Sequence, residues 1–200
     1  LGSNSLSEIV VFGKVAGESA ARYATGVAES GSSSVRRQAE AAASRLLALL
    51  DNERGERVAV LRDEMGDTME AGVGIYRSAT GMQQACDKLA ELRDRYRRGV
   101  KLDDRHRAFN TEWLSTIELG FTLEVAEAMA HSALGRRESR GAHVRLDEYK
   151  TRDDENFLQH SLATYTGDGP PSISLAPVTI TKSKPRTRSY GGEGKKAVMT

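Results

Sequence analysis

Residues 111–138 read TEWLSTIELGFTLEVAEAMAHSALGRRE, and this stretch decides the fold because it places apolar side chains on two faces of one helix. The two stripes consist of Leu114, Ile117, Phe121, Val125 and Met129, and of Leu119, Leu123, Ala126 and Ala130. Spacings of three and four residues are typical of a buried helix face. We therefore expect the central helix of a bundle, ending at Gly141 after a run of arginines that suits a helix C-terminus.

Other stretches predict further helices. We expect them over about 5–29, 34–50 and 58–71, and from a cap at Ser78 or Thr80 through Tyr96. After Gly141, Asp153 or Asp154 can cap a short helix through His160. Strands are expected at 161–166, 172–175 and 178–181. The fold class predicted is mainly α, a helical bundle with a spectrin-repeat-like three-helix core plus a small α+β C-terminal domain. The predicted domains are 1–30, 31–140 and 141–200, the last with a basic tail.

Composition excludes some classes of protein. Among 200 residues, 38% are hydrophobic and 28% are charged, and the formal net charge is +1. We find no apolar run long enough to span a bilayer and no signal peptide at the start of the sequence. The single cysteine, Cys86, excludes an intrachain disulfide and a cysteine-rich metal site, and its place on an apolar helix stripe predicts a buried, unreactive thiol.

The first six residues form the strongest candidate binding site. Leu1, Gly2, Ser3, Asn4, Ser5 and Leu6 combine a glycine-containing turn with the start of an apolar helix. Ser5 and Glu8 have capping-box spacing. A helix N-terminus presents backbone N–H donors and positive potential to an anionic or electron-rich group. An ordinary helix start remains the simpler interpretation of these residues alone.

A second candidate is the run from Arg136 to His143. Its Arg, Glu and His side chains suit acid–base chemistry, but we favour a structural Arg–carboxylate network, with Arg140 and His143 in structural roles. His131 is expected to be a satisfied core histidine, and His106 and His160 lack the spacing of metal ligands.

Basic residues also cluster along the chain, at 93–107 and 182–196. The first cluster is interspersed with aspartates and predicts a solvated helix end. The second predicts a flexible tail or a docking strip for an acidic partner or anionic membrane surface. We expect no nucleic-acid binding, since aromatic stacking residues are scarce in both.

Several segments resemble one protein family in order and distance. Residues 1–17, LGSNSLSEIVVFGKVAG, resemble the segment that closes the FAD-binding domain in the flavoprotein subunit of fumarate reductase and succinate dehydrogenase. Further resemblance lies in RDEMGDTMEAGVGIY at 62–76, FNT at 109–111 with IELG at 117–120, AHSALGRRESRGAHVRLD at 130–147, RDDENFLQHSL at 152–162, and VTI at 178–180 with YGG at 190–192. The chain lacks a G-x-G-x-x-G dinucleotide fingerprint.

The resemblance implies a C-terminal fragment of such a subunit, inactive alone. It implies that the opening residues contact FAD through the amides of Ser5 and Leu6, that the first helix belongs to an otherwise absent FAD-binding domain, and that the substrate arginine lies just before Leu1. Succinate and fumarate are the implied substrates. An iron–sulfur subunit and, through it, a membrane anchor with quinone are the implied partners. The implied location is peripheral, on the cytoplasmic side of a bacterial-type membrane.

Two alternatives remain open. L-Aspartate oxidase is a soluble relative with a similar flavin segment and the ESRG turn at 138–141, although the stretch from Arg152 onward favours the multi-subunit enzyme. A helical interaction module without redox chemistry is the alternative from another class.

Overall fold

The computed structural model describes residues 4–27, 33–182 and 185, which fall in two compact units, 1–48 and 49–200. The first unit holds helix α1 (Asn4–Gly26) and most of helix α2 (Ser33–Asp51). Both helices lie within three residues of their predicted bounds. The described side chains of α1 are exposed along its length, and they include Leu6, Ile9, Val10 and Phe12.

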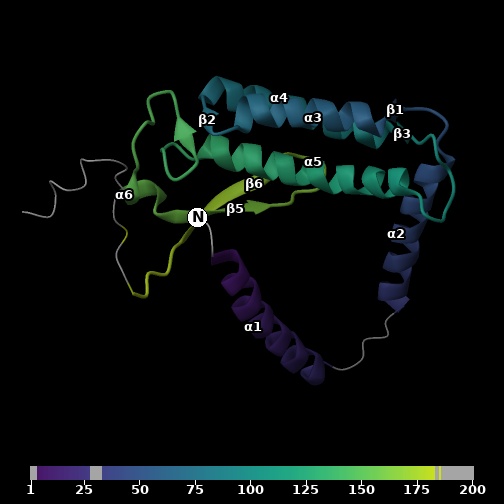
Figure 1. Cartoon of the computed structure of the whole chain (residues 1–200), viewed down its shortest axis with the longest axis horizontal. Helices are drawn as coiled ribbons and strands as arrows, with labels where there is room; N and C mark the ends of the chain where they lie inside the picture. The colour runs from purple at the N-terminus through teal and green to yellow at the C-terminus, as the bar shows by residue number, and fades with distance from the viewer. Residues whose placement is uncertain (1–3, 28–32, 183–184, 186–200) are drawn as a thin grey trace, which may run out of the picture. The chain divides into compact units, whose positions relative to one another are not determined.

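Three helices of the second unit lie side by side and form its core (Figure 1): α3 (Val58–Val73), α4 (Ala79–Arg98) and α5 (Thr111–Gly135). The side chains that meet between them are almost completely excluded from solvent, and they include Leu61, Met82, Leu89, Leu92 and Leu123. The predicted mainly α bundle with a three-helix core is therefore confirmed.

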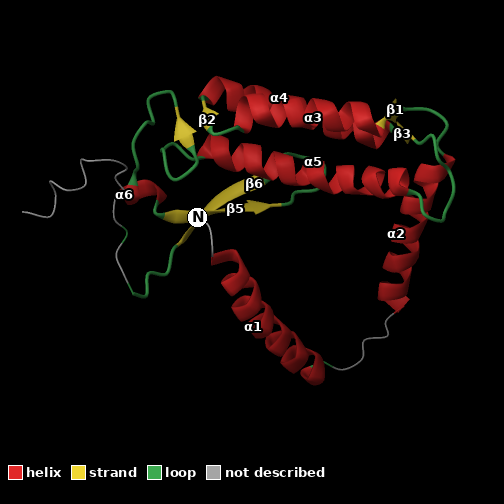
Figure 2. Cartoon of the chain, in the orientation of Figure 1, coloured by secondary structure: helices red, strands yellow, loops and turns green. Residues whose placement is uncertain are grey.

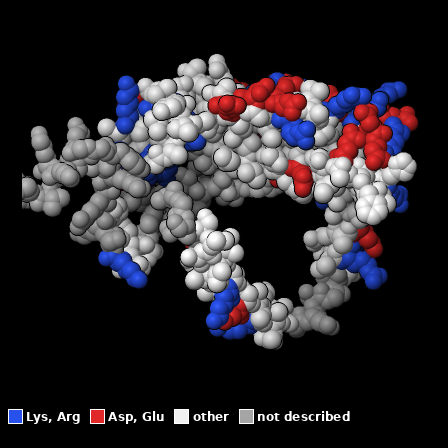
Figure 3. All heavy atoms as spheres, in the orientation of Figure 1, with Lys and Arg blue, Asp and Glu red and all other residues white. Residues whose placement is uncertain are grey.

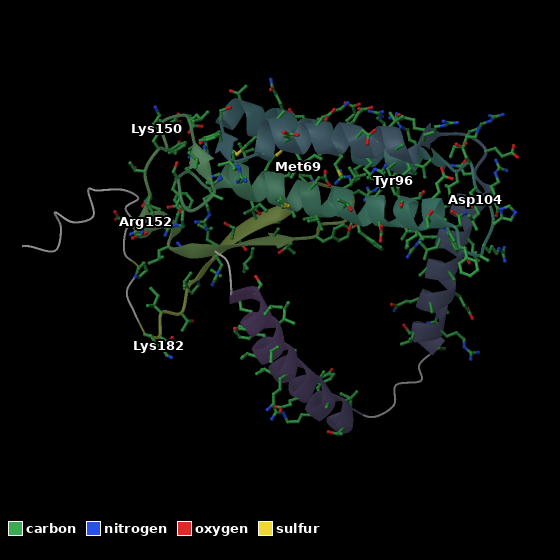
Figure 4. The ribbon with its side chains drawn as sticks, viewed as in Figure 1. Met69, Tyr96, Asp104, Lys150, Arg152 and Lys182 are labelled. Atoms are coloured by element: carbon green, nitrogen blue, oxygen red, sulfur yellow. The ribbon has the colours of Figure 1, made fainter. Side chains whose placement is uncertain are left out.

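Two glycines allow the helices to approach closely. A Cβ at Gly72 of α3 would lie 2.7 Å from the Cβ of Ala85 on α4. A Cβ at Gly120 of α5 would lie 2.8 Å from the Tyr96 hydroxyl, which instead donates a 3.0 Å hydrogen bond to the Thr116 carbonyl (Figure 4). The side chain of Tyr96 therefore connects α4 to α5 by occupying the space beside Gly120 that any larger residue would fill.

Short polar side chains set the starts of these helices. Ser78 caps α4 by accepting a hydrogen bond from the Gly81 amide at 3.1 Å. Asn110 caps α5 by accepting one from the Trp113 amide at 2.7 Å. Asp153 caps the four-residue helix α6 (Asp154–Phe157), which ends three residues before the predicted limit. Satisfied first-turn amides explain why the helices begin at these points.

Short strands lie at the two ends of the three-helix core and along α5 (Figure 2). Strand β1 (Glu56–Arg57) pairs in parallel with β3 (Val100–Lys101), and β2 (Tyr76–Arg77) pairs in parallel with β4 (Val144–Arg145). Strands β5 (Gln159–Thr164) and β6 (Ser172–Pro177) form an antiparallel hairpin against α5. The strand predicted at 178–181 is wrong, because the chain leaves the hairpin at Pro177 without a further partner strand among the described residues. The three predicted domain boundaries stay a prediction.

Helix α5 differs from its prediction in two ways. It ends at Gly135 instead of Gly141, because Arg136 already has an extended backbone and its guanidinium turns toward the carbonyls of Phe157 and Gln159. Only one apolar stripe is buried: Leu123 is 0% exposed, whereas Phe121 is 63% exposed. The periodicity predicted that both apolar faces of α5 would be covered. Only one face is covered, because α3 and α4 pack on the same side of α5.

This asymmetry predicts unequal costs of truncation. Leu123→Ala should lower the free energy of unfolding by about 2–5 kcal/mol, since it opens a cavity in the core. Phe121→Ala should change it by less than about 1 kcal/mol, since its side chain loses little buried area. Urea unfolding of the two variants measures both values, and equal losses would show that the exposed stripe is covered in solution.

Candidate functional site

The opening segment can be described only in part. Leu1, Gly2 and Ser3 lie outside the described residues, and so does the side chain of Asn4. Helix α1 begins at Asn4, so Ser5 occupies its first turn instead of the cap position predicted for it. First-turn amides have no carbonyl partner within the helix. The segment therefore has the donors that the sequence interpretation requires.

A fully buried carboxylate organises the region after α5. Glu138 is 0% exposed and accepts hydrogen bonds from Arg136 at 2.6 Å, from Arg140 at 2.8 Å and from the Asp153 amide at 2.9 Å. Burial alone would raise the pKa of Glu138, but the bonds from Arg140, Asp153 and Arg136 outweigh it and lower the pKa. The Arg–carboxylate network predicted for 136–143 is therefore present, and Arg140 belongs to it.

His143 has a structural place beside this network. Its Nδ1 lies 2.8 Å from Nη1 of Arg77, which can only donate, and its Nε2 lies 3.0 Å from the Arg136 carbonyl, which can only accept. These contacts require the neutral tautomer with the proton on Nε2. Burial lowers the pKa of His143, consistent with a neutral ring. Arg77 was not predicted as part of this site, because it lies 66 residues from its partner His143.

A cavity of about 480 Å³ opens next to these residues. Its wall includes Arg77, Arg136, Arg140, His143 and His160 together with apolar side chains of α3 and α5. The arginine network therefore borders a cavity of mixed polar and apolar lining at the junction of α3, α5 and β5.

A second buried ion pair joins α4 to α5. Nη1 of Arg93 lies 2.8 Å from Oε2 of Glu127, and the guanidinium also donates to the carbonyls of Asp168 and Gly169 in the β5–β6 turn. Burial raises the pKa of Glu127 against the opposing effect of Arg93. Nε of Arg93 and Oε1 of Glu127 are buried without a partner among the described residues. This pair holds the hairpin turn against the helices.

Three further arginines of the first basic cluster, Arg95, Arg97 and Arg105, form ion pairs with carboxylates of the described residues. Arg95 binds Glu56, Glu64 and Glu91. Acidic side chains gather over α3 and α4, and both signs of charge intermingle at the end that holds β1 and β3 (Figure 3). Arg93 is buried and the side chain of Arg95 is only 15% exposed, so the prediction of a solvated helix end is wrong for these two residues.

The predicted roles of the other histidines and of Cys86 have separate outcomes. His131 is half-buried and lines a second cavity, so its assignment to the core is wrong. His106 is exposed and bonds Asp104, and His160 is exposed. Within the described ranges, no group of three His, Cys, Asp or Glu residues is arranged to hold a metal ion. Cys86 is 2% exposed, which confirms its predicted burial, and this burial raises the pKa of its thiol to about 11.

Known proteins resemble this chain over almost its whole length. Residues 62–190 match the family described as fumarate reductase flavoprotein C-term. The fumarate reductase flavoprotein subunit of Haemophilus influenzae is 51% identical over 193 residues, which are 96% of this chain and 32% of the relative. The succinate dehydrogenase flavoprotein subunit of Coxiella burnetii is 37% identical over 186 residues, or 90% of this chain and 30% of the relative.

Solved structures agree with the sequence relatives. A chain of Escherichia coli quinol fumarate reductase superposes with a TM-score of 0.89 at 50% sequence identity, covering 96% of this chain and 33% of that one. The chain thus spans about a third of the length of its relatives. This chain therefore belongs to the fumarate reductase flavoprotein family and corresponds to the C-terminal part of its members.

Proposed function

We propose that this chain is the C-terminal part of an FAD-dependent subunit that interconverts succinate and fumarate and passes electrons through an iron–sulfur subunit to quinone. The observation that supports this most strongly is the 50% identity with E. coli quinol fumarate reductase over 96% of the chain. The bundle and hairpin supply the scaffold, and no catalytic residue is assigned within the chain.

The residues proposed to contact FAD are Leu1, Gly2, Ser3, Asn4, Ser5 and Leu6. Two features of α1 fit this role: its first-turn amides are free of intrahelical partners, and its apolar side chains, Leu6 and Ile9 among them, are exposed and suited to packing against a flavin-binding domain. When bound, FAD supplies the group that accepts and donates hydride. The amides of Ser5 and Leu6 would stabilise negative charge on the reduced ring through hydrogen bonds and the helix dipole.

The proposed assembly is peripheral on the cytoplasmic face of a membrane and held there by partner subunits. The relatives named above include E. coli quinol fumarate reductase, whose name contains the quinol of the proposed electron path. In the part of the chain that the structure describes, no helix combines the length and apolarity needed to cross a bilayer.

A chimeric subunit tests the proposal. The C-terminal third of the H. influenzae flavoprotein subunit is replaced by this chain and co-expressed with that organism's iron–sulfur subunit. We expect the purified chimera to retain flavin, to bind the iron–sulfur subunit and to oxidise reduced viologen when fumarate is added. A chimera that folds and holds flavin but reduces no fumarate would contradict the proposed activity.

Ser5→Pro in the same chimera tests the flavin contact. Proline removes the Ser5 amide donor but is tolerated in the first turn of a helix, so α1 should persist. We expect the flavin reduction potential to fall by roughly 10–40 mV, the equivalent of one helix-terminus interaction for a two-electron couple. The matched control is Ser5→Ala, which keeps the amide. Equal potentials in both variants would refute a contact through this amide.

A further inference from the structure

The cavity beside the arginine network has an unusual balance of charge. Three arginines and two histidines line it, and no carboxylate does: Arg77, Arg136, Arg140, His143 and His160. Its remaining wall combines the apolar side chains of Val73, Met129 and Ala133 with the uncharged polar residues Ser132, Gln159 and Ser161. At about 480 Å³, it falls within the size range of small-molecule sites.

Two of the three arginines already have carboxylate partners. Arg136 and Arg140 share the buried Glu138, and Arg140 also binds Asp154 at 2.6 Å. Arg77 differs from both, since no carboxylate of the described residues forms an ion pair with it. Its contacts are a hydrogen bond from Nε to the Gly74 carbonyl at 2.5 Å and one from Nη1 to Nδ1 of His143 at 2.8 Å.

The guanidinium of Arg77 is held in place by two hydrogen bonds and still has unused hydrogen-bond donors. The neutral His143 ring fixes Nη1, and strand β2, paired with β4, fixes the backbone. Among the described residues, no hydrogen bond or ion pair engages Nη2 of Arg77 or Nη1 of Arg140, and both arginines line the cavity. A half-buried cation without a counter-ion is costly, and this cost is relieved when an anion binds.

We propose that this cavity binds a carboxylate group carried on a short aliphatic chain, with Arg77 as its principal partner. The planar fork of a guanidinium matches a carboxylate. A ligand with a single negative charge is enough to balance the cavity, because Glu138 and Asp154 already neutralise Arg136 and Arg140. The apolar wall formed by Val73, Met129 and Ala133 suits the methylene groups that bear the carboxylate. The group can come from a small carboxylic acid in solution or from an Asp or Glu side chain elsewhere in the complete subunit.

Titration of the ¹⁵N-labelled 200-residue chain with sodium succinate and sodium acetate, against sodium chloride at equal ionic strength, tests the proposal. The arginine Nε–Hε signals and the backbone amides of His143 and Ser161 are followed by NMR. We expect saturable shifts of Arg77 with both acids and none with chloride. In Arg77→Gln the affinity read from the amides should fall about tenfold or more, whereas the exposed control Arg62→Gln should bind as the unmodified chain does.

The two sources of the carboxylate are separated by repeating the titration on the chimeric subunit labelled at arginine. A persistent response of Arg77 to succinate supports a small-molecule ligand. A loss of that response, together with a lower melting temperature of the Arg77→Gln chimera, supports an internal Asp or Glu. If neither acid shifts the Arg77 signal of the isolated chain saturably, the proposal is overturned, whether or not Arg77→Gln folds.

Discussion

Replacing Arg93 by methionine is expected to lower the free energy of unfolding by about 3–5 kcal/mol, because it leaves Glu127 as a buried carboxylate without its cation. Glu127 is 3% exposed, and Arg93 is its only ion-pair partner among the described residues. The substitution also orphans the carbonyls of Asp168 and Gly169, so we expect the β5–β6 turn to loosen from α4. Urea unfolding measures the loss, and hydrogen exchange of the turn amides measures the loosening.

Three comparisons test the cause of this loss. Arg93→Met combined with Glu127→Leu should recover most of the stability, since an apolar pair replaces the ions. Arg97→Met, which removes the exposed pair with Asp168 and a long hydrogen bond to the Gly167 carbonyl, should cost less than about 1 kcal/mol. Losing Arg93 should raise the pKa of Glu127 further above its ordinary 4.5. The stability loss of Arg93→Met must then grow as the pH rises through the raised pKa of Glu127, where the carboxylate becomes charged, and shrink in acid. A loss that does not depend on pH would exclude the unpaired Glu127 carboxylate as its cause.

Glu138→Gln is expected to have a comparably large effect, a loss of about 3–5 kcal/mol, because Arg136 and Arg140 would lose the buried charge that they share. The amide keeps the shape of the side chain but can accept fewer hydrogen bonds and carries no charge. Since Arg136 also holds the carbonyls of Phe157 and Gln159, the start of β5 should become less protected from hydrogen exchange.

The pH dependence supplies a second measurement. The folded pKa of Glu138 lies below its ordinary value of 4.5, so its stabilisation is complete above that pH and is lost as the pH falls through the lowered pKa. Acid titration of the unmodified chain should show this loss, and Glu138→Gln should lack it. Asp154→Asn is the matched control, because it removes an exposed partner of Arg140 and should cost little. Equal losses for both variants would argue against a special role of burial.

The helices and their caps could be predicted from the sequence because both depend on neighbours a few residues apart. The three- and four-residue spacing of Met82, Ala85, Leu89 and Leu92 gave the buried face of α4, and Ser78 marked its start. The long stretches of family sequence, such as residues 130–147, correctly predicted the family and the arginine network.

The polar site could be predicted only in part. The run from Arg136 to His143 indicated an Arg–carboxylate network, and Glu138 is its single acidic residue, but the complete burial of Glu138 and its bond from the Asp153 amide could not be predicted. Arg77 gave no signal at all, since its partner His143 is distant in sequence and the two meet only through the β2–β4 pair. Two-residue strands have no periodicity that a sequence could reveal.

The sequence alone determined where helices form, which residues cap several of them and which family the chain belongs to, because these features are written in local spacing and in contiguous motifs. Only the tertiary structure decided that Leu123 is buried while Phe121 is exposed, that Glu138 is enclosed by arginines, and that Arg77 faces a cavity without a carboxylate. The physical reason is that periodicity defines a face of a helix, whereas burial and the balance of charge depend on what distant segments bring against that face.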